Sequence, residues 1–519
     1  MVDKMKYIIL ILVFLLIPLA TATDYYYNQS GGNDSNDCST PALSCKTIVD
    51  LNTKSLSASD NVYFARGEVW RCSIDAYIDV VSGSSSGFVT YGAYGTGEKP
   101  EFLGSWNASN SSDWIDMGSN VWMYNKTLSW DIGSIIFNNG ASWCDMKTST
   151  EGLVNQNDCY WNSADYYVRL YSVSNPGTYY SDVEISYSYA ASNPEGLIDF
   201  TSKSYVIFED LSLKYGGIMG FNGANSHDIT IRNCDISYMG GHNGGVRYGG
   251  AIQFGLGGYN INVSGNNISY SWDACITAQS WDTGSGKTMI NQYYGYNICL
   301  YSPELFEWFQ SVADSGTNTG NIIIEHNTVA FGTNQESTAW CSTRGGRDLR
   351  LARTPAETDN FVVRNNIFYD NKRQWIDLGS SSSTKWLGEI TLNNNLYYSN
   401  YSLSTPIAFN GTNYATLTSF QTATEQENNG QQTNPLFLST DPSSPDFLIP
   451  ASNSPACTMS STGSYVGALP CETEVVTNIS CVGVKYGCVG SVCSYNNSVC
   501  LEESTYRTGT IVCIRGVCT

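Results

Sequence analysis

Short runs of alternating apolar and polar residues recur through the middle of the 519-residue chain. Each run is rich in β-branched residues, and this alternation is typical of a β-strand. The runs begin at Phe208, Ile231, Val263, Tyr296, Ile324, Val363 and Leu392. When the runs are aligned, one equivalent position is occupied in turn by Leu211, Cys234, Asn266, Asn297, Asn327, Asn366 and Asn395.

The repeat predicts a parallel β-solenoid, because single strands recur every 23 to 39 residues with no helical pattern between them. Asparagines stacked at one corner could hydrogen-bond from rung to rung, about 4.8 Å apart. The alternative is a β-sandwich with Asn-rich turns. A sandwich would not explain why Asn recurs at the same phase of each strand.

The variable spacing predicts where loops lie, because the core strand of a solenoid cannot change length. The surplus residues fall in 239–250, 279–292, 310–320 and 332–359. We expect these segments to be loops on one side of successive rungs, lining a groove that suits a linear polymer. The last would be a loop of nearly thirty residues, which is usually functional in a compact fold.

The first residues predict a secretory signal peptide. Lys4 and Lys6 precede an apolar stretch over 8–19, and Ala20-Thr21-Ala22 forms a small-residue cleavage site. The alternative is an uncleaved signal anchor. With cleavage after Ala22, we expect no membrane span in the mature chain and a secreted or cell-surface location.

Secretion makes the 17 cysteines candidates for disulfides. Cys38 and Cys45 are close enough to bridge locally, and the last six cysteines predict a disulfide-stapled module over 471–519. A Cys-only zinc site is the rival for this module, but the paired CxxC spacing is absent. The odd total leaves one thiol unpaired, such as Cys234, Cys275 or Cys299.

Three further segments carry a resemblance to a known group of proteins: 25–71, 89–105 with its YGxGxxP turn, and 434–470. With the repeat, they resemble secreted right-handed parallel β-helix proteins of the pectin-lyase-like superfold. The resemblance implies an all-β chain with a right-handed parallel β-helix over 23–470, interrupted by a β-rich insertion at about 106–198. The superfold hosts lyases, hydrolases, epimerases and non-catalytic adhesins, so the resemblance is specific for the fold and weak for the reaction.

The net charge narrows the choice of partner. The chain carries −21 with a pI of about 4.4, which argues against nucleic acid or an anionic membrane. We expect a monomer whose partner is a polysaccharide, and the aromatic residues of the insertion could stack on sugar rings.

Carboxylates follow the repeat in a second set of short strands, GAIQF, ACITA, ELFEW and QWIDL. Their alternation predicts an outward column of Gln253, Thr277, Glu307 and Asp377. Glu307 and Asp377 would lie two rungs apart, about 9–10 Å, near the upper end of the spacing for inverting glycoside hydrolysis. Asp273 and Asp282 flank the same face.

Arginines gather in two of the expected loops. Arg247 lies with His242 in 239–250, and Arg344, Arg347, Arg350 and Arg353 lie in TRGGRDLRLARTP. This local positive charge could hold a uronate or a sulfate. Alternatively, these arginines tie down the loops through Asp348, Glu336 or Glu357.

These patterns predict a secreted enzyme that cleaves a polysaccharide, with lyase chemistry favoured over hydrolysis because of the arginines. The candidate catalytic residues are Arg247, Glu307, Arg344 and His242. The candidate substrate-binding residues are Arg347, Asp273, Asp377 and Trp281, and Asp282 is a candidate calcium ligand. The alternative is a non-catalytic cell-surface or carbohydrate-binding β-helix protein.

Overall fold

The computed structural model describes most of the chain between residues 22 and 472. The described ranges are 22–72, 77–129, 131–187, 196–243, 246–280, 288–310, 318–332, 346–351, 358–379 and 389–472, with five short strands between 487 and 518. Within these ranges no helix is long and apolar enough to cross a bilayer.

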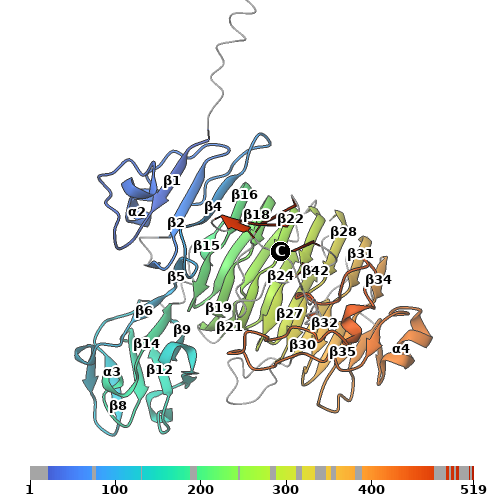
Figure 1. Cartoon of the computed structure of the whole chain (residues 1–519). Coiled ribbons are helices and arrows are strands. Elements are labelled where there is room, and N and C mark those ends of the chain that lie inside the picture. The colour runs from blue at the N-terminus through green and yellow to red at the C-terminus, as the bar shows by residue number, and fades with distance from the viewer. Residues whose placement is uncertain are drawn as a thin grey trace, which may run out of the picture.

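The repeating strands form two parallel sheets wound around one core, so the predicted parallel β-helix is confirmed (Figure 1). A ten-stranded sheet takes one short strand from each rung, and a seventeen-stranded sheet takes the others. The short strands include β19 (Asp235–Met239), β23 (Asn267–Ser271), β26 (Ile298–Leu300), β29 (Thr328–Ala330), β32 (Ile367–Tyr369) and β35 (Leu396–Tyr398). In the larger sheet the later rungs contribute pairs: β24 (Ala274–Ser280) with β25 (Thr288–Gly295), β27 (Glu304–Gln310) with β28 (Asn318–Glu325), β30 (Arg347–Leu351) with β31 (Thr358–Arg364), and β33 (Gln374–Leu378) with β34 (Ile390–Asn393).

The aligned asparagines form a buried ladder at one corner, as predicted. The carboxamide oxygen of Asn266 accepts one hydrogen bond, from the backbone N–H of Cys234 at 2.9 Å. Each later carboxamide oxygen accepts two from the preceding Asn, one from its backbone N–H and one from its carboxamide, at 2.9–3.0 Å. The residue before each Asn has a positive φ, between 55° and 67° along the ladder, so the chain turns sharply there. The last amide, on Asn395, donates to the buried carboxylate of Glu427.

A second, exposed ladder runs along the outside of the same rungs and was not predicted. Its carboxamides donate to the side-chain oxygen of the preceding rung at 2.9–3.2 Å. The members are Asp228, Asn260, Asn291, Asn321 and Asn360, all with φ of 54–55°. Asn and Asp tolerate this left-handed backbone conformation better than other residues with a Cβ, which explains their choice here.

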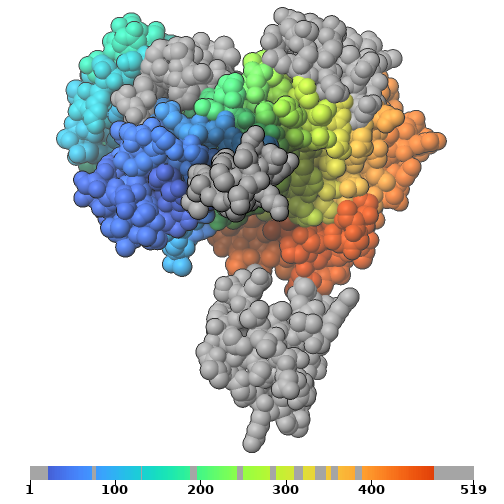
Figure 2. Space-filling model, turned by 90° about the horizontal axis from the view of Figure 1, so that it is seen from above, coloured from blue at the N-terminus to red at the C-terminus, as the bar shows by residue number. Residues whose placement is uncertain are grey.

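Short helices close both ends of the core. Helix α2 (Ile48–Leu51) buries Ile48 and Leu51 against the first rungs, and α4 (Leu417–Thr424) buries Leu417 and Phe420 at the other end. Such caps cover the apolar interior that an end rung would otherwise expose. The first and last rungs lie at opposite ends of the molecule (Figure 2).

The insertion is β-rich, as predicted, and has its own core. Its two mainly antiparallel sheets enclose a cluster that includes Trp114, Tyr124 and Val168, and it projects from the first rungs in Figure 1. Arg71 fixes it to the solenoid through two 2.7 Å hydrogen bonds to Glu184. It ends before Gly196, because β15 (Gly196–Asp199) already belongs to the parallel sheet.

The segment 434–472 does not add a rung but runs back over the ten-stranded sheet as a strap. Its Leu448 and Val466 pack on Leu300, Ile367 and other side chains of that sheet. Backbone N–H groups of the strap donate to Asn365 and Thr328, which belong to earlier rungs. The strap therefore covers the outer face of strands that come long before it in the sequence.

The expectation of a loop of nearly thirty residues over 332–359 is wrong. Strand β30 lies inside it and pairs in parallel with β27 and β33, because Leu349 and Leu351 fill the core. The extra residues also fall at more than one point in the strand order of a rung. The segment 331–346 precedes β30 and 352–357 follows it, while 239–250 forms a hairpin of β20 (Gly241–Asn243) and β21 (Val246–Tyr248).

Four disulfides join described cysteines. The predicted bond Cys38–Cys45 is present, with Cys144–Cys159, Cys275–Cys299 and Cys457–Cys471. Cys234 is free, as expected, but Cys275 and Cys299 are joined to each other, and Cys72 is a second free thiol among the described residues. In the C-terminal module, β39 (Gly487–Val489), β40 (Val492–Tyr495) and β41 (Ser498–Leu501) form a small antiparallel sheet.

Candidate functional site

Polar side chains cross the larger sheet in one row. The register aligns Gln253 with Thr277, Thr277 with Glu307, Glu307 with Arg350, and Arg350 with Asp377. The predicted column is therefore confirmed, and Glu307 and Asp377 are two strands apart, as expected. The predicted column lacks Arg350, because the sequence predicts a loop where β30 lies.

Three carboxylates gather around this row. One oxygen from each of Asp273, Glu304 and Glu307 lies within 4.8 Å of the others. Asp273 immediately precedes β24 and Glu304 begins β27. Glu304 and Glu307 are 1% and 4% exposed. Carboxylates this close and this buried repel one another unless positive charge or hydrogen-bond donors compensate them.

Arg350 supplies that positive charge. Its Nη1 lies 2.7 Å from Glu307 Oε1 and 3.7 Å from Glu304 Oε1. Gln279 Nε2 donates to the other oxygen of Glu307 at 3.0 Å. Burial acts to lower the pKa of Arg350, but the carboxylates, Glu304 and Glu307 first, outweigh burial and raise it. Glu307 is thus held at both oxygens.

Arg347 forms the second ion pair of the row. Its Nε lies 3.1 Å from Asp377 Oδ2, but this contact is an ion pair and not a hydrogen bond. Burial lowers the pKa of Arg347, and Arg350 adds to this while Asp377 opposes it. Arginine nevertheless stays protonated near neutral pH.

The expected tie through Asp348 is wrong. Asp348 lies in the interior and accepts a hydrogen bond from Asn371, and burial raises its pKa well above the usual value. Glu336 and Glu357 lie outside the described residues.

Arg347 and Arg350 do not form the open cationic groove that the sequence predicts, because each is paired with a carboxylate of a neighbouring strand. Arg350 is paired with Glu307, and Arg347 with Asp377. The positive charge inferred from the sequence is therefore neutralised, because both arginines lie on a strand between two acidic neighbours.

Other predicted residues are placed only in part. The register sets His242 opposite Arg247 in the β20–β21 hairpin, but their side chains lie outside the described part of the chain. The hairpin adjoins the site, because the N–H of Asp273 donates to Gly249 at 3.0 Å. Arg344, Trp281 and Asp282 lie outside the described residues, so their roles stay predictions.

Glu304 and Gln279 are the site residues that sequence reasoning missed. Glu304 stands three positions before Glu307 in the ELFEW strand, where simple alternation does not bring both carboxylates together. Gln279 follows the ACITA strand and reaches Glu307 across the strand pair.

The carboxylates do not fit a calcium site in this arrangement. Carboxylate oxygens suit Ca²⁺, but both oxygens of Glu307 are already bound by Arg350 and Gln279. A guanidinium 2.7 Å from one of them would also repel a divalent cation. We therefore assign no step to a metal.

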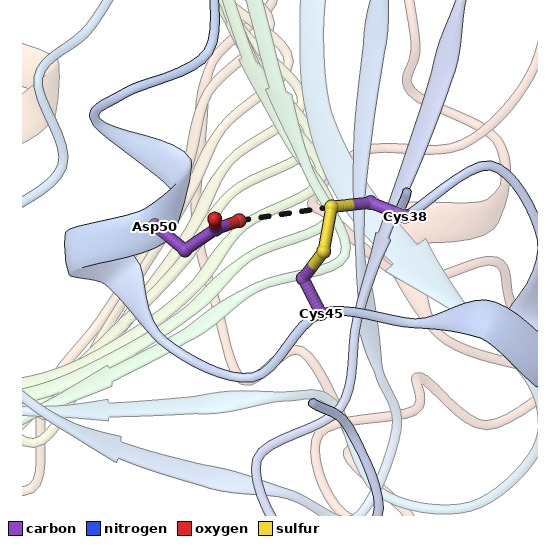
Figure 3. A group of neighbouring side chains, drawn as sticks. All are labelled: Cys38, Cys45 and Asp50. Atoms are coloured by element: carbon purple, nitrogen blue, oxygen red, sulfur yellow. Dashed lines mark hydrogen bonds between the residues drawn. A yellow bond between two sulfur atoms is a disulfide. The ribbon is translucent and has the colours of Figure 1, made fainter. Parts of the chain in front are cut away.

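A second group with metal-ligating side chains lies near the N-terminus. Asp50 is 3.6 Å from Cys38, which is bonded to Cys45 (Figure 3). Disulfide sulfurs are not thiolates, and thiolates are the form that binds metals. Asp50 pairs instead with Lys54 and accepts a hydrogen bond from Tyr27, so this group is structural.

Comparisons with known proteins concern the architecture. No family model and no curated protein matches the chain. Among solved structures, it is similar to a pectate lyase (12% identity, 87% of this chain and 96% of that one, TM-score 0.43) and a rhamnogalacturonan lyase (13%, 81% and 91%, TM-score 0.39). It is also similar to a lacto-N-biosidase of the GH136 family from Eubacterium ramulus (13%, 76% and 68%, TM-score 0.35). Likenesses this distant carry no argument about the reaction.

Proposed function

We propose that the protein is a glycan-cleaving enzyme that hydrolyses a glycosidic bond with the carboxyl groups of Glu307, Glu304 and Asp273. The observation that carries the proposal is their convergence within 4.8 Å on a face crossed by Arg350. Glycoside hydrolysis needs two carboxyl groups beside the bond, one to protonate the leaving oxygen and one to act as nucleophile or base.

The contacts assign a role to each carboxyl group. Glu307 is held by Arg350 and Gln279, so it is the oriented group and serves as nucleophile. Glu304 or Asp273 protonates the leaving oxygen and then activates water. Their short separation favours retention of configuration, which uses carboxyl groups about 5–5.5 Å apart. Glu307 acting with Asp377 would instead give inversion.

The charge of the site favours a neutral glycan. Arg347 and Arg350 are each paired with a carboxylate, so neither is left to hold the carboxylate of a polyuronate or the sulfate of a sulfated chain. We further propose that the enzyme acts outside the cell, which the four disulfides between described cysteines support.

Elimination, which the sequence favours, is the second candidate because Arg347 and Arg350 lie in the row beside the carboxylates. A lyase needs a base and a cation that neutralises the substrate carboxylate. Arg347 and Arg350 are engaged by Asp377 and Glu307, which supports hydrolysis over elimination.

The test is activity on a panel of neutral and acidic polysaccharides, with reducing ends and absorbance near 235 nm measured in parallel. We expect reducing ends without unsaturated products, and NMR of the first product should show the retained anomer. Glu307→Gln should lower the rate by about 10²–10⁴-fold, because it removes the nucleophile.

Glu325→Gln is the matched control. Glu325 pairs with Arg364 on neighbouring strands at the same 2.7 Å, away from the polar row, and its variant should keep wild-type activity. Unsaturated ends would replace our proposal with a lyase. Binding without cleavage across the panel would leave a carbohydrate-binding protein.

A further inference from the structure

The residue before the first described strand presents its backbone nitrogen to a buried carboxylate. Strand β1 (Asp24–Tyr27) pairs with β2 (Asn61–Ala65), and the residue before it, Thr23, is already fixed at both ends. The carbonyl of Thr23 accepts from Asn61 at 2.9 Å, and the N–H of Thr23 donates to Asp60 Oδ1 at 2.8 Å.

Asp60 is built into a rigid turn. Its Oδ2 accepts from the N–H of Ser57 at 2.8 Å, while its own N–H donates to Ser57 at 3.1 Å and its carbonyl accepts from Thr90 at 3.0 Å. It is 4% exposed. In the described part of the chain no lysine or arginine forms an ion pair with Asp60, so hydrogen bonds alone offset the burial of its charge.

Such a carboxylate is poised for a cation at the position of the Thr23 nitrogen, since a buried charge is costly without a partner. Thr23 is also the residue that would follow the small-residue site Ala20-Thr21-Ala22. Ala22 and Thr23 are both exposed. The carboxylate and the sequence pattern thus point to the same nitrogen.

We propose that the chain is cleaved between Ala22 and Thr23 and that the new α-ammonium group of Thr23 is bound by Asp60. A signal peptidase would hydrolyse this amide with one water molecule, leaving the carboxylate on Ala22 and the ammonium on Thr23. The peptide N–H has one hydrogen to donate, whereas the ammonium has three and carries a full charge, so the hydrogen bond becomes charge-assisted. Processing at any other bond would remove Thr23 or leave its nitrogen uncharged.

The first test is the mass of the N-terminal peptide of the protein secreted with its own leader, which should begin at Thr23. The second is a cycle of four proteins. Two of them begin at Thr23, one with the wild-type Asp60 and one with Asp60→Asn. The other two carry Gly-Ser before Thr23, again one with Asp60 and one with Asp60→Asn. Asp60→Asn should shift the unfolding equilibrium about fivefold more in the chains that begin at Thr23.

A different N-terminal residue, or equal effects of Asp60→Asn in both backgrounds, would overturn the proposal. If Asp60→Asn does not fold, the binding of the Thr23 amine is tested in the wild-type chain by chemical acylation. Acylation of the Thr23 amine should then be about tenfold slower in the folded protein than in an unfolded control, because the bound ammonium is protected. An equal rate would count against the pairing.

Discussion

Glu427 shows how a single residue ends the buried asparagine ladder, called the inner ladder below, as the exposed one is called the outer ladder. Each ladder amide needs an oxygen beyond it, and Glu427 supplies that oxygen to Asn395 and Tyr397. Burial raises the pKa of Glu427 to about 7, although these hydrogen bonds act in the opposite direction. The end of the ladder therefore titrates near neutral pH.

The raised pKa predicts that stability falls as pH rises. The folded state holds the Glu427 proton more tightly than the unfolded state, so its contribution is complete below about pH 4.5 and is lost as pH rises through about 7. The free energy of unfolding should fall by about 3 kcal/mol between these two pH values. Urea unfolding at pH 5 and pH 8 measures it.

Glu427→Gln should flatten that dependence, because the amide oxygen still accepts from Asn395 and Tyr397 but does not titrate. Asp348, whose pKa burial also raises, contributes in the same direction and should leave a smaller residual slope. Glu425→Gln, at an exposed position two residues earlier, is the control and should behave as wild type. An unchanged slope in Glu427→Gln would contradict this interpretation.

Residues of the site were predictable only where a repeating pattern placed them. Glu307 and Asp377 follow from strand alternation, and the register confirms their column. The meeting of Glu304 with Asp273 depends on how the chain turns before β27 and β24, which alternation does not encode. The pairing of Arg350 with Glu307 required the position of β30.

At the scale of elements, the inner ladder was readable because its side chains repeat with the rung. The outer ladder had the same signal, since each of its members stands six positions before an inner one, for example Asn291 before Asn297. Strand β30 was harder to identify, because the sequence on both sides of it carries no repeating pattern and only the alternation in RDLRL marks it.

The two ladders should differ in their contribution to stability. The fully buried carboxamide of Asn297 accepts hydrogen bonds from Asn266 and donates to Asn327 and Val263. Asn297→Ala removes these bonds and should lower the free energy of unfolding by about 3 kcal/mol. Asn291→Ala, in the same rung, removes exposed hydrogen bonds and should cost about 1 kcal/mol. Denaturant unfolding of both variants measures the difference. Equal losses would show that the buried ladder has no special role.

At the scale of the whole molecule, the strap ties the last rung to the middle of the solenoid. It buries Leu448, Met459 and Val466 against the ten-stranded sheet, and its last described backbone hydrogen bond joins Glu472 to Pro450. The sequence indicated a closing segment there, but not its direction, because the segment has little regular strand pattern.

Two truncations test the strap. A chain of residues 23–472 keeps every strap contact that the structure describes, up to Glu472, and is the reference for urea unfolding. A chain of residues 23–433 should lose about 5 kcal/mol of unfolding free energy, since several apolar side chains lose their cover. Identical midpoints for the two truncations would mean that the strap does not stabilise the solenoid.

The direction of the inner ladder also limits how such a chain can lengthen. Every amide receives from the rung before it and donates to the rung after it. A duplicated rung inside the series would find a donor on one side and an acceptor on the other. A rung added after Glu427 would meet a carboxylate that, once ionised, has no hydrogen to give. Gene duplication can therefore extend this protein from within, while its end stays fixed.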